Sequence, residues 1–308
     1  MANSRTLRIG SRGSQLALWQ ANHIATRLRE RGHNVEIEII RTTGDAMQSV
    51  SFAQVGAKGM FTKEIEEALI EARIDLAVHS LKDLPTSLGE PFTLGAIPER
   101  ADPRDAFVAV DHASFAALPG GARVGTSSLR RQAQLKSLRR DLEYVEFRGN
   151  VDTRLRKLAE GQVDAIILAS AGLDRLGHSE QICERFPALI LCPAAGQGAL
   201  GIETRAGDTA TMDALRFLDD ARTRFAVTAE RAALAGLGGG CQVPIGVHCE
   251  ATSNGYVIAG VVTSPDGSGL LRAELEHQLG LSAEALGEKL AHRLLEQGAG
   301  LLLQASLP

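Results

Sequence analysis

Two short apolar segments, residues 75–80 (DLAVHS) and 164–170 (DAIILAS), constrain the fold of this chain most strongly. Each follows a helical pattern, begins with an aspartate after a β-branched residue, and ends in a serine. Near-continuous apolar runs of this length are typical of buried strands in a sheet covered by helices. The similarity between the two segments favours two related lobes, although chance similarity of buried strands would produce the same pattern.

Strand and helix patterns alternate around these two segments, which predicts an α/β fold with parallel strands. Ser14 is the expected N-cap of the first helix and Gly32 its stop. Ligands of such sheets bind beyond the carboxyl ends of the strands. The expected strands are residues 7–11, 35–40, 75–80, 123–126, 142–147, 164–170 and 200–203, and the expected helices are residues 15–31, 61–72, 129–138 and 151–160.

Two segments are expected to cross between lobes: residues 97–105 (IPERADPRD) and 192–199 (CPAAGQGA). A chain that crosses twice makes the first lobe discontinuous. Beyond residue 219, a helix, three strands joined by turn sequences and a closing helix predict a separate small α+β domain. The predicted domains are residues 1–98 with 199–218, residues 99–198, and residues 219–308.

Composition excludes several classes of protein. The net charge of the 308-residue chain is −4, so no global charge favours nucleic acid. Its four cysteines form no CxxC pair, which argues against a disulfide framework, and no Cys/His spacing fits a metal site. Without a signal-like N-terminus or an apolar run of about 18 residues, a cytoplasmic protein without membrane contact is expected. Nothing requires more than a monomer.

A glycine-rich loop, residues 237–246 (LGGGCQVPIG), contains a single cysteine, Cys241. Glycines allow the backbone to approach a bound group closely, and Pro244 stiffens the exit of the loop. The loop fits two interpretations. Either Cys241 is an inert buried thiol beside a helix-ending turn, or it is an accessible thiol with a function.

The middle of the chain is locally basic. Residues 123–175 contain eleven Lys or Arg and seven Asp or Glu. Many of these are expected on solvent-exposed helix faces, but five arginines lie at or near predicted strand–helix junctions. There, segment 126–131 (TSSLRR) predicts a cradle for carboxylate or phosphate, because arginine and helix N-termini favour such anions. The five are Arg130, Arg131, Arg148, Arg154 and Arg175.

Asp83 follows Lys82 at the end of the expected strand 75–80. One interpretation is an exposed turn aspartate before Pro85, paired with its neighbour. The other is an acid–base or cation-stabilising carboxylate in a cleft. Aspartate at a strand end is common, so the two interpretations stay open at this point.

Taken together, these segments resemble the porphobilinogen deaminase (hydroxymethylbilane synthase) family. The resemblance extends from about residue 8 to residue 246, and the last sixty residues carry less of it. The matching strings are RIGSRGSQLAL (8–18), GMFTKE (59–64), AVHSLKDLP (77–85), DPRDAF (102–107), VGTSSLRR (124–131), RGNVDTRL (148–155), PAAGQG (193–198) and GGCQVPIG (239–246).

The resemblance implies two periplasmic-binding-protein-like α/β lobes facing a cleft, plus the small C-terminal domain. It also implies a transferase that joins four porphobilinogen molecules into the linear tetrapyrrole hydroxymethylbilane and releases ammonia. The chain would grow on a dipyrromethane cofactor attached by a thioether to Cys241. Asp83 would be the catalytic residue, assisting the departure of ammonia and stabilising positive charge on the azafulvene and pyrrole nitrogens.

By the same resemblance, most of the remaining site residues bind carboxylates of the cofactor or the substrate. Asp45 and Lys58 would belong to a loop that covers the cleft, and no metal is implied. The implied cofactor-binding residues besides Cys241 are Lys82, Ser127, Ser128, Arg130, Arg131 and Arg148, and the implied substrate-binding residues are Arg12, Ser14, Arg148, Arg154 and Arg175.

The sequence departs from the family pattern at two positions. Gln54 stands where many relatives have lysine, and Asp152 replaces a frequent glycine and adds a negative charge near Arg154. The sequence also allows two other functions to be compared with this one. A two-lobed anion-binding protein without catalysis would share the architecture but would leave the loop of Cys241 unexplained. Nucleic-acid binding through the basic segment fits poorly because only 4% of the residues are aromatic.

Overall fold

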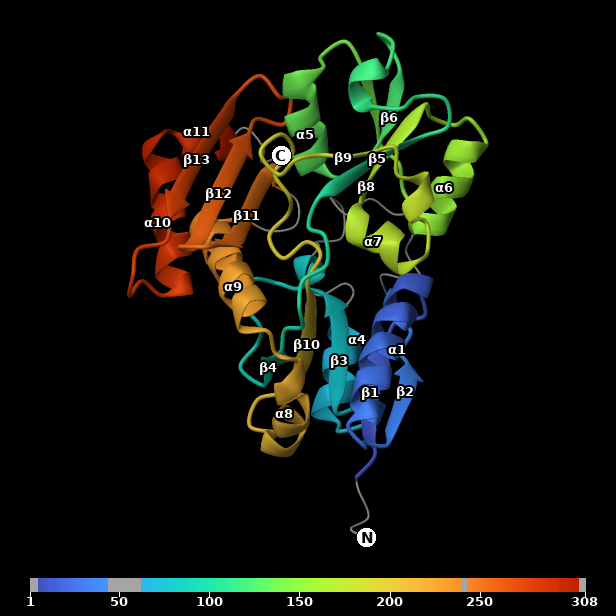
Figure 1. The fold of residues 1–308 in the computed structure, drawn as a ribbon, viewed down its shortest axis with the longest axis vertical. Coiled ribbons are helices and arrows are strands. Elements are labelled where there is room, and N and C mark those ends of the chain that lie inside the picture. The colour runs from blue at the N-terminus through green and yellow to red at the C-terminus, as the bar shows by residue number, and fades with distance from the viewer. Residues whose placement is uncertain (1–4, 44–61, 240–242, 305–308) are drawn as a thin grey trace. The chain divides into compact units, whose positions relative to one another are not determined.

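The computed structural model describes residues 5–43, 62–239 and 243–304, and the chain forms two compact units. The first unit combines residues 1–100 with 199–224, and the second combines residues 101–198 with 225–308. Each unit is therefore built from two separate stretches of chain, as the colours in Figure 1 show. The predicted second lobe and C-terminal domain both fall in the second unit, and their boundary stays a prediction.

The first unit contains a five-stranded sheet with the order β2-β1-β3-β10-β4. β1 runs parallel to β2 and β3, whereas β10 runs antiparallel to β3 and β4. The apolar face of α1, including Ile24 and Leu28, packs on Ile9 and Val78 of the sheet. The elements of this unit are β1 (Leu7–Ser11), α1 (Gln15–Glu30), β2 (Val35–Ile39), α4 (Lys63–Ile70), β3 (Leu76–Ser80), β4 (Phe92–Ala96), β10 (Leu200–Arg205) and α8 (Thr209–Leu215).

The second unit contains a five-stranded sheet of the same design, with the order β7-β6-β8-β5-β9. β6 runs parallel to β7 and β8, and β5 runs antiparallel to β8 and β9. The elements around this sheet are β5 (Asp105–Ala109), β6 (Arg123–Gly125), α5 (Leu129–Leu138), β7 (Glu143–Val145), α6 (Val151–Ala159), β8 (Ala165–Ala169), α7 (Ser170–Arg175) and β9 (Glu184–Arg185).

The two sheets share one arrangement at the amino end of the segments that the sequence singled out: an aspartate paired with an arginine of the neighbouring strand. Asp75 Oδ2 accepts a hydrogen bond of 2.9 Å from the backbone N–H of Arg8, and Asp164 Oδ2 accepts one of 2.6 Å from that of Arg123. In return, each aspartate N–H donates to the carbonyl of the same arginine. The aspartate that begins each segment therefore ties its strand to the central parallel neighbour.

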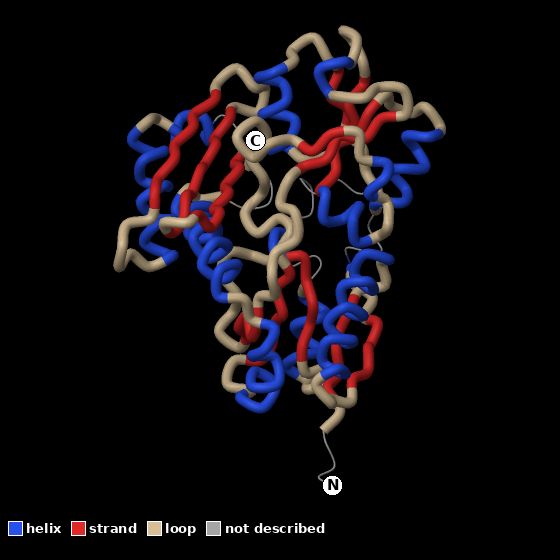
Figure 2. Tube along the Cα trace, viewed as in Figure 1, coloured by secondary structure: helices blue, strands red, loops and turns tan. Residues whose placement is uncertain are grey.

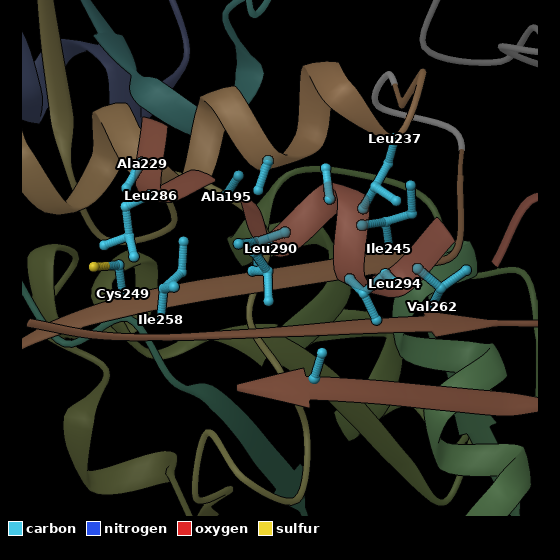
Figure 3. Close-up of a cluster of buried hydrophobic side chains, with 14 of the residues drawn as sticks. Ala195, Ala229, Leu237, Ile245, Cys249, Ile258, Val262, Leu286, Leu290 and Leu294 are labelled. Atoms are coloured by element: carbon cyan, nitrogen blue, oxygen red, sulfur yellow. The ribbon is translucent and has the colours of Figure 1, made fainter. Parts of the chain in front are cut away.

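The second unit also contains a three-stranded antiparallel sheet, ordered β11-β12-β13. Helices α9 and α10 cover one face of it, and Leu286, Leu290 and Leu294 project from α10 into the core (Figure 3). α10 begins where Ser282 Oγ accepts from the N–H of Ala285 at 3.2 Å. These elements are α9 (Ala221–Gly236), β11 (Ile245–Thr252), β12 (Gly255–Thr263), β13 (Leu270–Glu276), α10 (Ala283–Glu296) and α11 (Ala299–Gln304).

The predicted fold class is confirmed: two helix-covered sheets and a separate C-terminal sheet with helices (Figure 2). The expectation of purely parallel strands is wrong. Each large sheet is mixed, because the strand next to β3 or β8 enters from a crossing segment and runs in the opposite direction. The sequence does not predict β4, β5, β9, α7, α8 and α11. Across the described ranges, no helix is long and apolar enough to span a membrane.

Candidate functional site

The carboxyl ends of β1 and β3 meet at one edge of the first sheet, because these neighbouring strands are parallel. Arg12 and Ser14 follow β1, and Lys82 and Asp83 lie in the short 3-10 helix that follows β3. Gln20 Nε2 of α1 donates a hydrogen bond of 2.8 Å to Ser80 Oγ, which fixes the end of β3. The structure thus brings these four predicted site residues to the same edge.

Within that edge, Ser14 and Asp83 have different roles. Ser14 Oγ accepts from the N–H of Ala17 at 3.3 Å and caps α1, as the sequence predicts. Asp83 is exposed, and none of the described side chains forms a hydrogen bond or ion pair with its carboxylate. A carboxylate held on a rigid turn without a fixed partner is available for proton transfer.

A second edge is formed by the carboxyl ends of β6, β7 and β8, which are parallel neighbours in the second unit. Ser127 and Ser128 follow β6, Arg148 follows β7, and Arg175 ends the short helix after β8. Ser128 caps α5, although its Oγ accepts from the N–H of Arg131 over a long 3.5 Å. Four more of the predicted site residues therefore meet at this edge.

Arg130 and Arg131, in the first turn of α5, are both about 5% exposed and share one buried carboxylate. Arg130 Nη1 donates to Asp105 Oδ2 at 2.7 Å, and Arg131 donates to Asp105 Oδ1 from Nε at 3.0 Å and from Nη2 at 2.7 Å. Gln197 Nε2 adds a further donor, to Asp105 Oδ1 at 2.8 Å. This cluster of Asp105, Arg130, Arg131 and Gln197 is called the Asp105 cluster below.

The electrostatics of this edge favour an anion. Burial alone would raise the pKa of Asp105, but the charges of Arg130 and Arg131 outweigh it and hold that pKa far below its ordinary value. Burial, followed by the charge of Arg131, lowers the pKa of Arg154 to about 10. Arg154 therefore remains charged at neutral pH, and among Arg130, Arg131, Arg154 and Asp105 the guanidiniums outnumber the one carboxylate.

Three buried polar atoms at this edge have no hydrogen-bond partner among the described residues. They are Ser127 Oγ, Arg154 Nε and Ser170 Oγ. Buried donors without partners are costly in folded proteins, so such groups indicate a site for a ligand. A carboxylate is the ligand that matches both a guanidinium and a hydroxyl.

Arg148 and Arg175 contact neighbouring parts of their own unit. Arg148 donates to Glu146 Oε1 from Nε at 2.8 Å. Arg175 Nη2 donates to the carbonyl of Gly198 at 2.7 Å, and burial lowers the pKa of Arg175 to about 10 although Asp174 acts in the opposite direction. The guanidinium of Arg175 remains charged at neutral pH.

Some predicted positions lie outside the described residues: Cys241, Asp45, Lys58 and the departure Gln54. The other departure, Asp152, is described. Its Oδ1 lies 3.4 Å from His178 Nε2, so the added negative charge has a neighbour of its own.

Asp105 and Gln197 lie within the matching strings DPRDAF and PAAGQG, but the sequence alone indicates no role for either. The signal available was a charged residue at the start of the apolar segment DAFVAV (105–110). An aspartate at the first position of a buried strand needs a buried cation as partner.

Two models of known protein families match this chain. Residues 7–213 match the family model described as porphobilinogen deaminase, dipyromethane cofactor binding domain. Residues 224–296 match the porphobilinogen deaminase C-terminal domain.

The chain belongs to the porphobilinogen deaminase family.

Similar porphobilinogen deaminases cover nearly the whole chain. That of Nitratidesulfovibrio vulgaris (strain Miyazaki F) is 50% identical over 305 residues, which is 97% of this chain and 96% of the relative. That of Desulforudis audaxviator is 50% identical over 301 residues, 97% of each. Among solved structures, the methionine-binding protein MetQ matches with a TM-score of 0.46 at 13% identity, over 74% of this chain and 93% of that one.

For a porphobilinogen deaminase, the second edge fits the dipyrromethane cofactor that its family model names. The unpartnered Ser127 Oγ and Arg154 Nε and the excess of guanidinium charge over the Asp105 carboxylate match the acidic side chains of a pyrrole ring. Residues of this edge that would hold the cofactor are Ser127, Ser128, Arg130, Arg131 and Arg148.

Proposed function

We propose that this chain joins four porphobilinogen molecules head to tail into hydroxymethylbilane, with release of ammonia, in tetrapyrrole biosynthesis. The observation that carries the proposal is membership of the porphobilinogen deaminase family over residues 7–213 and 224–296. The enzyme is a transferase that forms carbon–carbon bonds. The dipyrromethane cofactor supplies the fixed end on which the new chain is built.

Cys241 is proposed as the covalent anchor of that cofactor, through a thioether. The support comes from the family string GGCQVPIG at 239–246. The described cysteines offer a contrast: Cys192 and Cys249 are buried and only Cys183 is exposed. Burial raises the pKa of the Cys192 thiol to about 12, so that thiol is a poor nucleophile.

Asp83 is proposed as the catalytic carboxylate. Its exposed position on the turn after β3 supports this role, because the carboxylate has no fixed partner among the described residues. It would pass a proton to the departing amine and then balance the positive charge that remains on the substrate nitrogen. Lys82 lies beside it and would bind a carboxylate.

The arginines are proposed to bind acetate and propionate side chains. The guanidiniums of Arg130, Arg131 and Arg154 carry three positive charges, and the one carboxylate among them is that of Asp105, which Arg130 and Arg131 share. Two charges therefore remain uncompensated within this group, which corresponds to the two carboxylates of one pyrrole ring. Arg12, Ser14, Arg148 and Arg175 are proposed to bind further substrate carboxylates, and Asp45 and Lys58 to belong to a covering loop.

Substrate and setting complete the proposal. The partner is porphobilinogen, a small molecule, and the proposed enzyme is a cytoplasmic monomer that binds neither nucleic acid nor membrane. Sedimentation velocity at several protein concentrations tests the monomer.

Intact mass spectrometry of the purified protein tests the function. The expected result is an added mass equal to two condensed pyrrole units, absent from Cys241→Ser and present in the control Cys183→Ser, which changes an exposed cysteine. Purified protein with an unmodified Cys241 and no turnover of porphobilinogen would instead support a two-lobed anion-binding protein without catalysis.

A further inference from the structure

Asp105 is the first residue of β5 and the last residue of the first crossing segment. Its side chain is fully buried. Both carboxylate oxygens accept hydrogen bonds from guanidiniums: Arg130 Nη1 contacts Oδ2 at 2.7 Å, and Arg131 Nη2 contacts Oδ1 at 2.7 Å. A carboxylate placed in this way fixes the orientation of both planar groups, since bidentate pairs are directional.

Further contacts tie the same groups to the backbone. Arg130 Nη1 also donates to the carbonyl of Cys192 at 2.7 Å, and Arg131 Nη1 donates to that of Ile167 at 3.1 Å. Gln197 Nε2 joins Asp105 Oδ1 to the carbonyl of Pro103, at 2.8 and 2.7 Å. The Asp105 cluster therefore connects α5, β8 and both crossing segments within one unit.

We propose that Asp105 is a positioning residue for cofactor attachment: it orients Arg130 and Arg131 so that their cationic edge receives a carboxylate of the cofactor. This inference rests on the proposed function. Asp105 does not touch the cofactor itself. It acts through the two arginines, at the edge where Ser127 Oγ and Arg154 Nε lack partners among the described residues.

Replacing the Asp105 carboxylate distinguishes a positioning role from a simple effect of charge, because the two predict opposite changes in the binding of an anionic ligand. Asp105→Asn raises the net charge of the cluster from +1 to +2, which by Coulomb attraction alone would strengthen binding of an anionic ligand. If Asp105 acts by orienting the arginines, Asp105→Asn weakens binding of the ligand. The asparagine side chain has one acceptor oxygen, so it cannot accept hydrogen bonds from the guanidiniums at both of its terminal atoms. Asp105→Glu keeps the charge but moves the carboxylate by one methylene, so positioning predicts a loss there as well.

The experiment measures the fraction of folded, purified protein that carries the dipyrromethane mass after expression. Asp105→Asn and Asp105→Glu are each expected to lower this loaded fraction more than threefold relative to the unchanged chain. The matched control is Asp164→Asn. Asp164 also pairs with an arginine of the same sheet, Arg123, but at the opposite end of β8, so normal loading is expected even where stability falls.

A melting curve of each variant accompanies the mass measurement. A purely structural role for Asp105 predicts that the loaded fraction of each variant depends only on its melting temperature. Asp164→Asn and Asp105→Asn would then have equal loaded fractions if their melting temperatures were equal. The positioning role predicts a loading defect in Asp105→Asn at matched stability. The residual loaded protein of each variant should show an unchanged KM for porphobilinogen at the first addition if the defect is confined to cofactor attachment.

A second pair of variants decides the question if both Asp105 variants fail to fold. Gln197→Leu removes a neutral donor to Asp105, whereas Gln134→Leu removes an equally buried glutamine that bonds only the backbone of Cys192. Gln197→Leu should load at least threefold less than Gln134→Leu. Equal loading of the pair, or loading of either Asp105 variant within threefold of the unchanged chain, overturns the inference. An unchanged chain without cofactor would instead overturn the proposed function.

Discussion

The guanidinium of Arg175 donates a hydrogen bond of 2.7 Å to the carbonyl oxygen of Gly198, the last residue before the chain returns to the first unit. The same carbonyl accepts the N–H of Ala101 at 3.2 Å, from the outgoing crossing. Both crossing segments are thus tied together at one carbonyl. A residue that the family resemblance assigns to substrate carboxylates also holds this junction.

Gly198 itself cannot be replaced without disturbing that junction. Its φ is +86°, and an added Cβ would lie 2.5 Å from the carbonyl oxygen of Ala101. Gly198→Ala should lower the free energy of unfolding by about 1–3 kcal/mol for the backbone strain and by about 1–3 kcal/mol more for the clash. Gly207→Ala is the control, because Gly207 has φ +81° but nothing within 4 Å. Urea unfolding of both variants measures the difference, and equal losses would contradict the predicted clash.

Asp83→Asn should keep the cofactor but lose turnover. The asparagine retains the shape of the side chain and cannot exchange a proton, so kcat should fall by about 10²- to 10⁴-fold. Intact mass checks the cofactor, and porphobilinogen consumption checks the rate. Asp83→Glu, which restores an acid, should recover part of the loss. Near-normal turnover of Asp83→Asn would remove Asp83 from its proposed role.

Arg154→Leu should separate stability from binding. No described residue pairs with the Arg154 side chain, and its Nε lacks a partner, so loss of this charge should leave the free energy of unfolding unchanged or higher. Loss of one charge-assisted hydrogen bond, about 1.5–3 kcal/mol, should raise the KM for porphobilinogen about 10- to 150-fold.

The control for that variant is Arg139→Leu. Arg139 pairs with Asp141 at 2.7 Å and donates to the carbonyl of Leu118 at 2.9 Å. Its loss should therefore reduce stability and leave KM unchanged. Opposite outcomes for the two variants would show that Arg154 is a structural residue.

Ionisation of the Asp105 carboxylate should make the free energy of unfolding depend on pH in the acid range. Its pKa in the folded protein lies far below the value of about 3.9 expected in the unfolded chain. Its ionised form therefore stabilises the fold above about pH 4, and this contribution is lost progressively as the pH falls below that value. The difference in unfolding free energy between the unchanged chain and Asp105→Asn should be constant from pH 7 to pH 5 and should shrink at pH 3. A difference that does not change with pH would show that the carboxylate is not the source.

Elements with strong local signals could be predicted from the sequence. The strand at Leu7–Ser11 and the helix at Leu129–Leu138 have the predicted bounds, because alternation and N-capping serines are local patterns. β5 was missed because its first residue is a charged aspartate that followed a proline-rich crossing. Its cations come from α5, and a partner that distant is invisible to local pattern.

The candidate site was predictable as a list of residues but not as a set of contacts. Sequence placed Arg130 and Arg131 at a strand–helix junction, where the structure has them. The sequence did not indicate that the Asp105 carboxylate accepts hydrogen bonds from both guanidiniums. Asp105 and Arg130 lie 25 residues apart in the chain, so their pairing depends on how β5 and α5 pack. The antiparallel direction of β5 and β10 was unpredictable for the same reason.

Because β10 lies between β3 and β4, a nascent chain can complete the first sheet only after all strands of the second sheet have been synthesised. All other strands of the first sheet have been synthesised by Ala96, but the strand between β3 and β4 begins only at Leu200. The second sheet is complete at Arg185. During synthesis the second sheet can therefore close first, while β3 waits with an unpaired edge, a state in which strands are prone to aggregate.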